Sequence, residues 1–274
     1  RLFMALVFVF LYAPIVLLIV FSFISGNSNL VCLGFSLHWY TKLFRNRIIM
    51  QSVYTTLLVS LLATIIATVA GTFAAIGFYA MRRRVRNPLM TVNNIPMMNA
   101  DIVTGVSLCL LFVVFFNGWH SFAVWVNGWQ SLVVLPERLT LGFGTLLIAH
   151  VCFNIPYVIL SVGPKLRQMD RNLIDAAQDL GCTWMQAFWK VIIPEAKPAL
   201  ITGAVISTVT ILGYSAMAGT IGGGGLGQIA ITYGYQKYDD QIVWLCVALT
   251  ILIVQILQEF GMYIARRTDR RAHS

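Results

Sequence analysis

Six long apolar runs separated by short polar segments set the pattern of this chain. A helix of about 20 mostly apolar residues crosses the hydrocarbon core of a bilayer, so each run is long enough to form one span. Three asparagines, a proline and an aspartate interrupt the first half of the third run. The pattern predicts an all-α membrane protein, a single domain over residues 1–274, with about six transmembrane helices at about 2–25, 53–80, 89–116, 141–163, 199–219 and 242–265.

The composition supports a membrane location. Apolar residues make up 58% of the chain and charged residues 11%, whereas a soluble domain carries about 25% charged residues. The net charge of +9 would suit a nucleic-acid partner, but the basic residues cluster in short segments beside the apolar runs. Such clustering is typical of membrane topology and argues against nucleic-acid binding.

Lysine and arginine are distributed unequally between the two sides of the membrane. If both termini are cytoplasmic, 14 of the 19 basic residues fall on the cytoplasmic side and five on the outer side. Short cytoplasmic segments of membrane proteins carry an excess of Lys and Arg. We therefore expect a multi-pass protein with both termini and the polar segment 165–197 in the cytoplasm.

The segment 165–197 is polar between two apolar runs, and its pattern predicts two short helices joined by a turn. Asp170 is placed to cap the first helix, because its carboxylate can accept a hydrogen bond from a free backbone N–H. Gly181 is placed to end that helix, because glycine adopts the left-handed conformation that closes many helices.

The second helix of this segment has its own start and stop signals. Thr183 followed three residues later by Gln186 is a capping-box pattern, which marks a helix start. Pro194 and Pro198 are expected to end the helix, because proline cannot donate a backbone hydrogen bond.

The same segment carries the spacing of a known motif. An acidic residue and two alanines are followed by a glycine and then by a hydrophobic residue with proline: Asp175, Ala176, Ala177, Gly181, Ile193 and Pro194. The spacing resembles the EAA motif of binding-protein-dependent ABC importer permeases, with Asp in place of the usual Glu. The alternative is an ordinary loop helix between two spans.

The resemblance implies the fold of a type I ABC importer permease in a bacterial inner membrane. It implies that the motif forms a coupling helix seated in a groove of a cytoplasmic ABC ATPase dimer, where ATP is hydrolysed. The other implied partners are a second permease subunit, identical or distinct, and a periplasmic or lipid-anchored substrate-binding protein.

The likeness changes along the chain and leaves the substrate open. Residues 1–198 resemble the permease of spermidine/putrescine importers, whereas residues from about 204 to 271 resemble the permease of D/L-methionine importers. The acidic pair that polyamine permeases typically carry in the fifth span is absent near Gly213. We favour a polyamine as substrate, with methionine as the alternative, and both a divergent permease and a recombined sequence stay open.

Four polar residues in or near the spans are candidates for the translocation path or gate: Asp101, Asn154, Tyr214 and Ser215. A carboxylate in hydrocarbon is costly, so Asp101 should face a cavity, a partner or a polar neighbour. Its alternative role is a cap of the third span. Asn154 could equally form a helix–helix hydrogen bond, and Tyr214 with Ser215 belongs to a small-residue face suited to close helix contact.

No catalytic motif is present in the sequence, and neither a cofactor nor a metal site is indicated. The glycine-rich stretch 219–228 lacks the Gly-Lys-Ser/Thr ending of a phosphate-binding loop, so it is no ATP site. We therefore expect a transport subunit and not an enzyme. The alternative from another class is a stand-alone secondary transporter or channel, for which we find no inverted repeat.

Overall fold

The computed structural model describes residues 2–23, 41, 45–99, 101–129, 141–170, 172–214, 224–237 and 240–268. Its elements within these ranges are helical, which confirms the all-α expectation. The helices are α1 (Leu2–Ser22), α3 (Arg47–Ala80), α4 (Arg83–Met98), α5 (Asp101–Trp129), α6 (Phe143–Gln168), α7 (Asn172–Asp179), α8 (Trp184–Ala187), the π-helix η1 (Phe188–Ile192), α9 (Ile193–Gly213), α11 (Leu226–Ile229), the π-helix η2 (Ala230–Gln236) and α12 (Asp240–Thr268).

Five stretches of described helix are long and apolar enough to cross a membrane: Arg47–Ala80, Val103–Val124, Phe143–Gln168, Trp184–Gly213 and Ile242–Thr268. They correspond to the second to sixth expected spans. The first expected span is α1, whose described apolar part, Phe3–Leu17, is shorter. The expectation of a multi-pass helical membrane protein is therefore confirmed.

The third expected span, 89–116, is wrong in its boundaries. The helix ends after α4, where Asn99 has an extended backbone with φ −80° and ψ 152°. Asparagine competes with helical hydrogen bonds through its own side chain, which favours a helix end here. The apolar span accordingly begins after the break, within α5, and the polar first half of the expected span forms most of α4.

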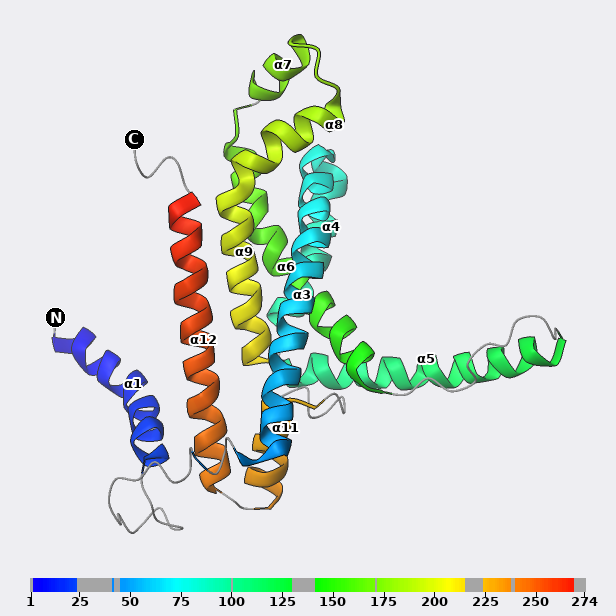
Figure 1. The fold of residues 1–274 in the computed structure, drawn as a ribbon. Helices are drawn as coiled ribbons and strands as arrows, with labels where there is room; N and C mark the ends of the chain where they lie inside the picture. The colour runs from blue at the N-terminus through cyan, green and yellow to red at the C-terminus, as the bar shows by residue number, and fades with distance from the viewer. Residues whose placement is uncertain are drawn as a thin grey trace.

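Three helices form the centre of the molecule. Helices α3, α6 and α9 pack against one another, and α12 packs along α9 (Figure 1). Small residues allow these contacts: a side-chain carbon placed on Gly71 of α3 would lie 2.7 Å from Cβ of Val158 on α6. Close helix approach at small residues is the usual means of packing in membranes. Helix α5 runs away from this centre (Figure 1) and buries little of its surface.

The expectation that Pro194 and Pro198 end the second short helix is wrong. Helix α8 continues through η1 into α9, so Trp184–Gly213 is one uninterrupted helical run. In the wider π-helical turn the N–H of Ile193 bonds to the carbonyl of Phe188, five residues back. Pro194 then occupies the first turn of α9. Proline is tolerated in a first helical turn, and the helix therefore passes it without a break.

The basic segments gather at one end of the bundle. Arg82, Arg83 and Arg86 line a cavity together with Arg167, and Arg267 at the end of α12 shares a second cavity with lysines of α6, η1 and α9. This end also carries α7 (Figure 1). Three of the segments that the charge pattern assigned to one side of the membrane, at 82–86, 165–197 and 266–267, thus share one end of the molecule.

Candidate functional site

The helices α7, α8 and η1 (residues 172–192) form a projection that we call the tip, at the end of the bundle (Figure 1). Its first helix begins as the sequence predicts. The N–H of Asn172 donates to Oδ1 of Asp170 at 3.0 Å, and the N–H of Leu173 bonds to the Asp170 carbonyl at 3.2 Å. Asp170 therefore caps α7 with both its side chain and its backbone.

Gly181 ends α7 in the left-handed conformation, with φ +84°. The N–H of Gly181 donates to the carbonyl of Gln178 at 2.8 Å, and the N–H of Cys182 donates to the carbonyl of Ala177 at 3.0 Å. This pair of bonds is the Schellman motif. A Cβ at position 181 would meet nothing within 4 Å, so backbone conformation, and not space, requires the glycine.

A capping box starts the next helix directly after this turn. The N–H of Gln186 donates to Oγ1 of Thr183 at 3.3 Å, and the N–H of Thr183 donates to Oε1 of Gln186 at 3.0 Å. The two bonds satisfy the free backbone groups at the start of α8. The turn between α7 and α8 is thus held by backbone hydrogen bonds at its start and by side-chain-to-backbone hydrogen bonds at its end.

Phe188 anchors the tip to the bundle. Its side chain is 3% exposed. Its ring stacks on the ring of Phe73 in α3, with 6.0 Å between the ring centroids, and on the ring of Trp184 in α8, with 5.9 Å between the centroids. Ala177 of α7 is also buried, whereas Asp175 and Ala176 are exposed. Of the two motif alanines, Ala177 therefore lies on the inner face of α7, toward the rest of the tip, and Ala176 lies on its outer face.

Large apolar side chains remain exposed on the tip: Leu173, Leu180, Trp184, Met185 and Trp189. Leu180 is 87% exposed although it directly precedes the turn. Exposed apolar side chains in a cluster mark interaction surfaces. The tip stands at the end of the bundle, next to its basic residues, so the surface is suited to a protein partner outside the membrane.

Buried polar side chains form a seam between α3, α6 and α9. Oγ1 of Thr64 lies 3.0 Å from Oγ1 of Thr208. Asn154 is fully buried on α6; its Nδ2 donates to the carbonyl of His150 at 2.6 Å, while its Oδ1 has no hydrogen-bond partner among the described residues. Ser207 Oγ on α9 is buried without a partner in the same part of the chain. Unpaired polar atoms inside a membrane bundle are costly, which makes them candidates for function.

The candidate path residues divide into those that the structure places and those that it does not. Tyr214 ends α9, and its hydroxyl lies 2.8 Å from that of Tyr157. Asp101 is the first residue of α5, and its side chain is not part of the described structure. Ser215 also lies outside the described residues. Asn154 on α6 and Tyr214 at the end of α9 lie near each other along the bundle, since the ring centroid of Phe153, next to Asn154, lies 5.7 Å from that of Tyr214.

The other members of the seam and the partner of Tyr214 were missed in the sequence. Tyr157, Thr64, Ser207 and Thr208 were not singled out, although Thr56, Ser60 and Thr64 recur every four residues in an apolar run. That spacing places them on one helix face. Such a polar stripe was the signal for the seam. Among the described residues, no group of three or more His, Cys, Asp or Glu side chains could hold a metal ion.

Residues 67–271 match the model of a protein family described as "Binding-protein-dependent transport system inner membrane component". Relatives include the spermidine/putrescine transport system permease protein PotC of Haemophilus influenzae, 32% identical over 75% of this chain and 71% of the relative. The putrescine transport system permease protein PotI of Escherichia coli is 32% identical over 80% of this chain and 72% of the relative.

A shorter match is closer in identity. The probable D-methionine transport system permease protein MetI of Vibrio cholerae is 44% identical over 117 residues, which are 43% of this chain. The match spans about half of that relative, 52% of its length. The two sets of relatives confirm both resemblances drawn from the sequence.

Solved structures share the fold. The inward-facing MetNI methionine ABC transporter superposes with a TM-score of 0.64 at 25% identity, over 81% of this chain and 97% of the other. A bacterial alginate ABC transporter, in complex with alginate pentasaccharide-bound periplasmic protein, superposes with a TM-score of 0.72 over 98% of this chain and 93% of the other. Its identity of 15% supports the fold alone. The architecture is that of type I ABC importer permeases.

Proposed function

The chain belongs to the family of binding-protein-dependent transport system inner membrane components, and we propose that its tip couples the translocation path to an ATPase in the cytoplasm. The observation that carries this proposal is the unbroken helical run from Trp184 in the tip to Gly213 in the bundle. A force applied to α8 is delivered directly to α9, because no loop lies between Trp184 and Gly213 to absorb it.

The tip is proposed as the docking surface for a dimer of ABC ATPase subunits. The residues assigned to coupling are Asp175, Ala176, Ala177, Gly181 and Pro194. Asp175 and Ala176 are exposed on α7, and the apolar side chains of Leu180 and Trp184 are exposed on the same tip. Aromatic side chains with apolar neighbours commonly supply most of the binding energy at protein interfaces.

Motion of the tip would reach the bundle through close contacts of α9. Oγ of Ser161 on α6 donates to the Ala199 carbonyl at 3.1 Å, and Gly203 lies against the same serine. Because packed helices exchange discrete arrangements more readily than they deform, α9 and α6 would shift together. The Thr64–Thr208 pair between α3 and α9 would then break or re-form, whereas the Tyr157–Tyr214 pair would move with α6 and α9.

The polar seam is proposed as part of the path and gate, with Asn154 and Tyr214 in it and Asp101 and Ser215 as further members. Alternating access would expose this seam first to one side of the membrane and then to the other. The permease contributes different affinities for substrate in the two states. ATP hydrolysis on the separate subunit supplies the drive.

A polyamine, spermidine or putrescine, is the proposed substrate. The polyamine relatives match over 75–80% of this chain, and Asp101 would attract a cationic solute. The methionine relative, at 44% identity over 117 residues, supports D/L-methionine as the second candidate. A polyamine importer would pair this chain with a distinct permease, whereas a methionine importer would use two copies.

The proposed setting is a bacterial inner membrane, with both termini cytoplasmic and one permease domain over residues 1–274. A periplasmic or lipid-anchored binding protein would deliver the substrate. Cells that produce the chain with its ATPase and binding protein should take up labelled putrescine or spermidine in an ATP-dependent manner. Uptake of methionine alone would reassign the substrate, and uptake without the ATPase would identify a secondary transporter or channel.

Gly181→Asp tests the coupling. Asn and Asp tolerate the left-handed conformation better than other side chains, and the added atoms meet nothing within 4 Å at Cβ, so the variant should insert normally. Its charge should abolish ATPase docking and uptake. Gly181→Asn is the matched control of nearly equal size and should retain more uptake; full uptake by Gly181→Asp would refute the assignment.

A further inference from the structure

Four arginines line one cavity at the tip end of the bundle. The cavity measures about 490 Å³, and its lining includes Arg82, Arg83 and Arg86 at the α3–α4 junction and Arg167 on α6. No acidic residue is among the described residues that line it. Four positively charged residues around one space repel one another, so the cavity favours an anionic occupant.

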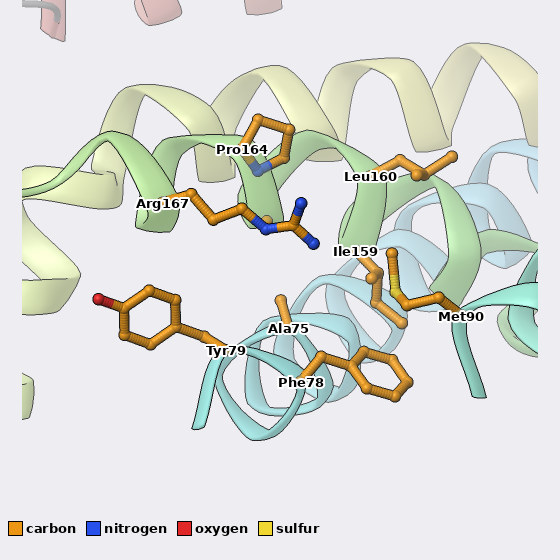
Figure 2. Close-up of a pocket in the computed structure, with 9 residues that line it drawn as sticks. Ala75, Phe78, Tyr79, Met90, Ile159, Leu160, Pro164 and Arg167 are labelled. Atoms are coloured by element: carbon orange, nitrogen blue, oxygen red, sulfur yellow. The ribbon is translucent and has the colours of Figure 1, made fainter. Parts of the chain in front are cut away.

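An apolar crevice of about 90 Å³ adjoins this cavity, between α3, α4 and α6 (Figure 2). It is lined by Ala75, Phe78, Met90, Ile159, Leu160, Gly163 and Pro164, and it shares Tyr79 and Arg167 with the arginine cavity. In Figure 2, Tyr79 lies toward one side and Phe78 and Met90 toward the other, and the Arg167 side chain extends from the Tyr79 side toward the middle. The two spaces therefore form one site with a cationic mouth and an apolar slot.

The chemistry of the two parts selects the ligand. The guanidinium group of arginine can donate two parallel hydrogen bonds to the oxygens of a phosphate. The crevice offers apolar contact to a hydrocarbon chain. A free phosphate would leave the crevice unused, and a neutral lipid would leave the arginines without a counter-charge. Basic pockets between membrane helices are known to hold lipid headgroups.

We propose that Arg82, Arg83, Arg86 and Arg167 bind the phosphate of an anionic phospholipid whose acyl chain lies in the crevice between α3, α4 and α6. The site joins the α3–α4 junction to the end of α6, just before the tip. The bound lipid stabilises this part of the bundle by neutralising the arginines. None of the lining residues is among those assigned above to ATPase coupling or to the translocation path.

The test is lipid competition on the purified full-length chain. Detergent-solubilised protein is incubated with equal amounts of phosphatidylglycerol and phosphatidylcholine of the same acyl composition, and bound lipid is counted by native mass spectrometry. Phosphatidylglycerol should be retained in excess, and Arg167→Gln should lower its affinity about fivefold, as expected for one basic residue near an anionic lipid. Equal retention of the two lipids would overturn the proposal.

The matched control is Arg84→Gln, because Arg84 lies in the same basic run but does not line the cavity. It should leave the lipid preference unchanged; a loss equal to that of Arg167→Gln would show a diffuse charge effect and overturn the site. Millimolar inorganic phosphate should not displace the lipid, and displacement would reassign the arginines to a free phosphate.

A second variant tests the crevice without touching the arginines. A Cβ on Gly163 meets nothing within 4 Å, so Gly163→Leu should fill the crevice without disturbing the helix. It should lower phosphatidylglycerol retention, whereas Gly77→Leu, which is equally open but outside the crevice, should not. Unchanged retention in a folded Gly163→Leu protein would show that no acyl chain occupies the crevice.

Discussion

The hydroxyl oxygens of Tyr157 on α6 and Tyr214 at the end of α9 lie 2.8 Å apart and share a hydrogen bond. The two residues are 57 positions apart in the chain. The bond joins the helix that leads into the tip to the helix that leads out of it. It therefore reports directly on the relative position of α6 and α9.

Removing either hydroxyl should cost about 1 kcal/mol of unfolding free energy, the usual net value of such a bond. We expect Tyr157→Phe and Tyr214→Phe each to lower the thermal midpoint. The double variant should lower it by less than the sum of the two single decreases, because both substitutions remove the same bond. Tyr54→Phe, at a tyrosine that is 66% exposed, is the control. Additive losses would show that the two hydroxyls act independently.

Two glycines of α3 should respond to alanine with opposite signs. A Cβ on Gly71 would lie 2.7 Å from Cβ of Val158, whereas a Cβ on Gly77 meets nothing within 4 Å. Gly71→Ala should therefore lower the free energy of unfolding by about 1–3 kcal/mol, because the added methyl group overpacks the contact. Gly77→Ala should stabilise by up to about 1 kcal/mol, the difference in helix propensity. Thermal unfolding in detergent measures both; equal shifts would contradict the close contact of α3 with α6.

Neighbouring aromatic residues of the tip should separate stability from partner binding. Phe188 is 3% exposed and Trp189 is 57% exposed. Phe188→Ala should lower the free energy of unfolding by about 3–5 kcal/mol, as for a buried aromatic residue. Trp189→Ala should lower it by only about 1 kcal/mol, because Trp189 loses only an edge contact with Phe188. Under the proposed function, Trp189→Ala should nevertheless weaken co-purification of the ATPase. Equal destabilisation by the two variants would contradict the anchoring role of Phe188.

Asn154→Leu tests whether a buried polar group is kept for transport. The side chain is fully buried, and its Oδ1 has no partner among the described residues. Replacing such a group with an apolar one of similar volume is often neutral or stabilising. We expect an unchanged or higher thermal midpoint together with impaired uptake. Normal uptake would remove Asn154 from the path, and strong destabilisation would assign it a structural role.

The local features of the tip could be predicted because their interactions are local in sequence. Asp170, Gly181 and Thr183 act on backbone groups no more than five residues away. Capping chemistry needs only those neighbours. The same logic failed at Pro194, because continuation of the helix depends on the π-helical turn before it, whose residues Phe188 and Ile192 pack in a core built from distant helices.

The order of apolar and polar residues was sufficient to establish a helical membrane protein, its second, fourth, fifth and sixth spans, and the caps of the tip. These follow from transfer free energy and from backbone hydrogen bonds within one turn. The seam and the lipid site depend on pairs such as Thr64 with Thr208, 144 residues apart, and on arginines that meet only when α4 folds against α6. Only packing of the helices brings such groups together, because no local interaction connects them.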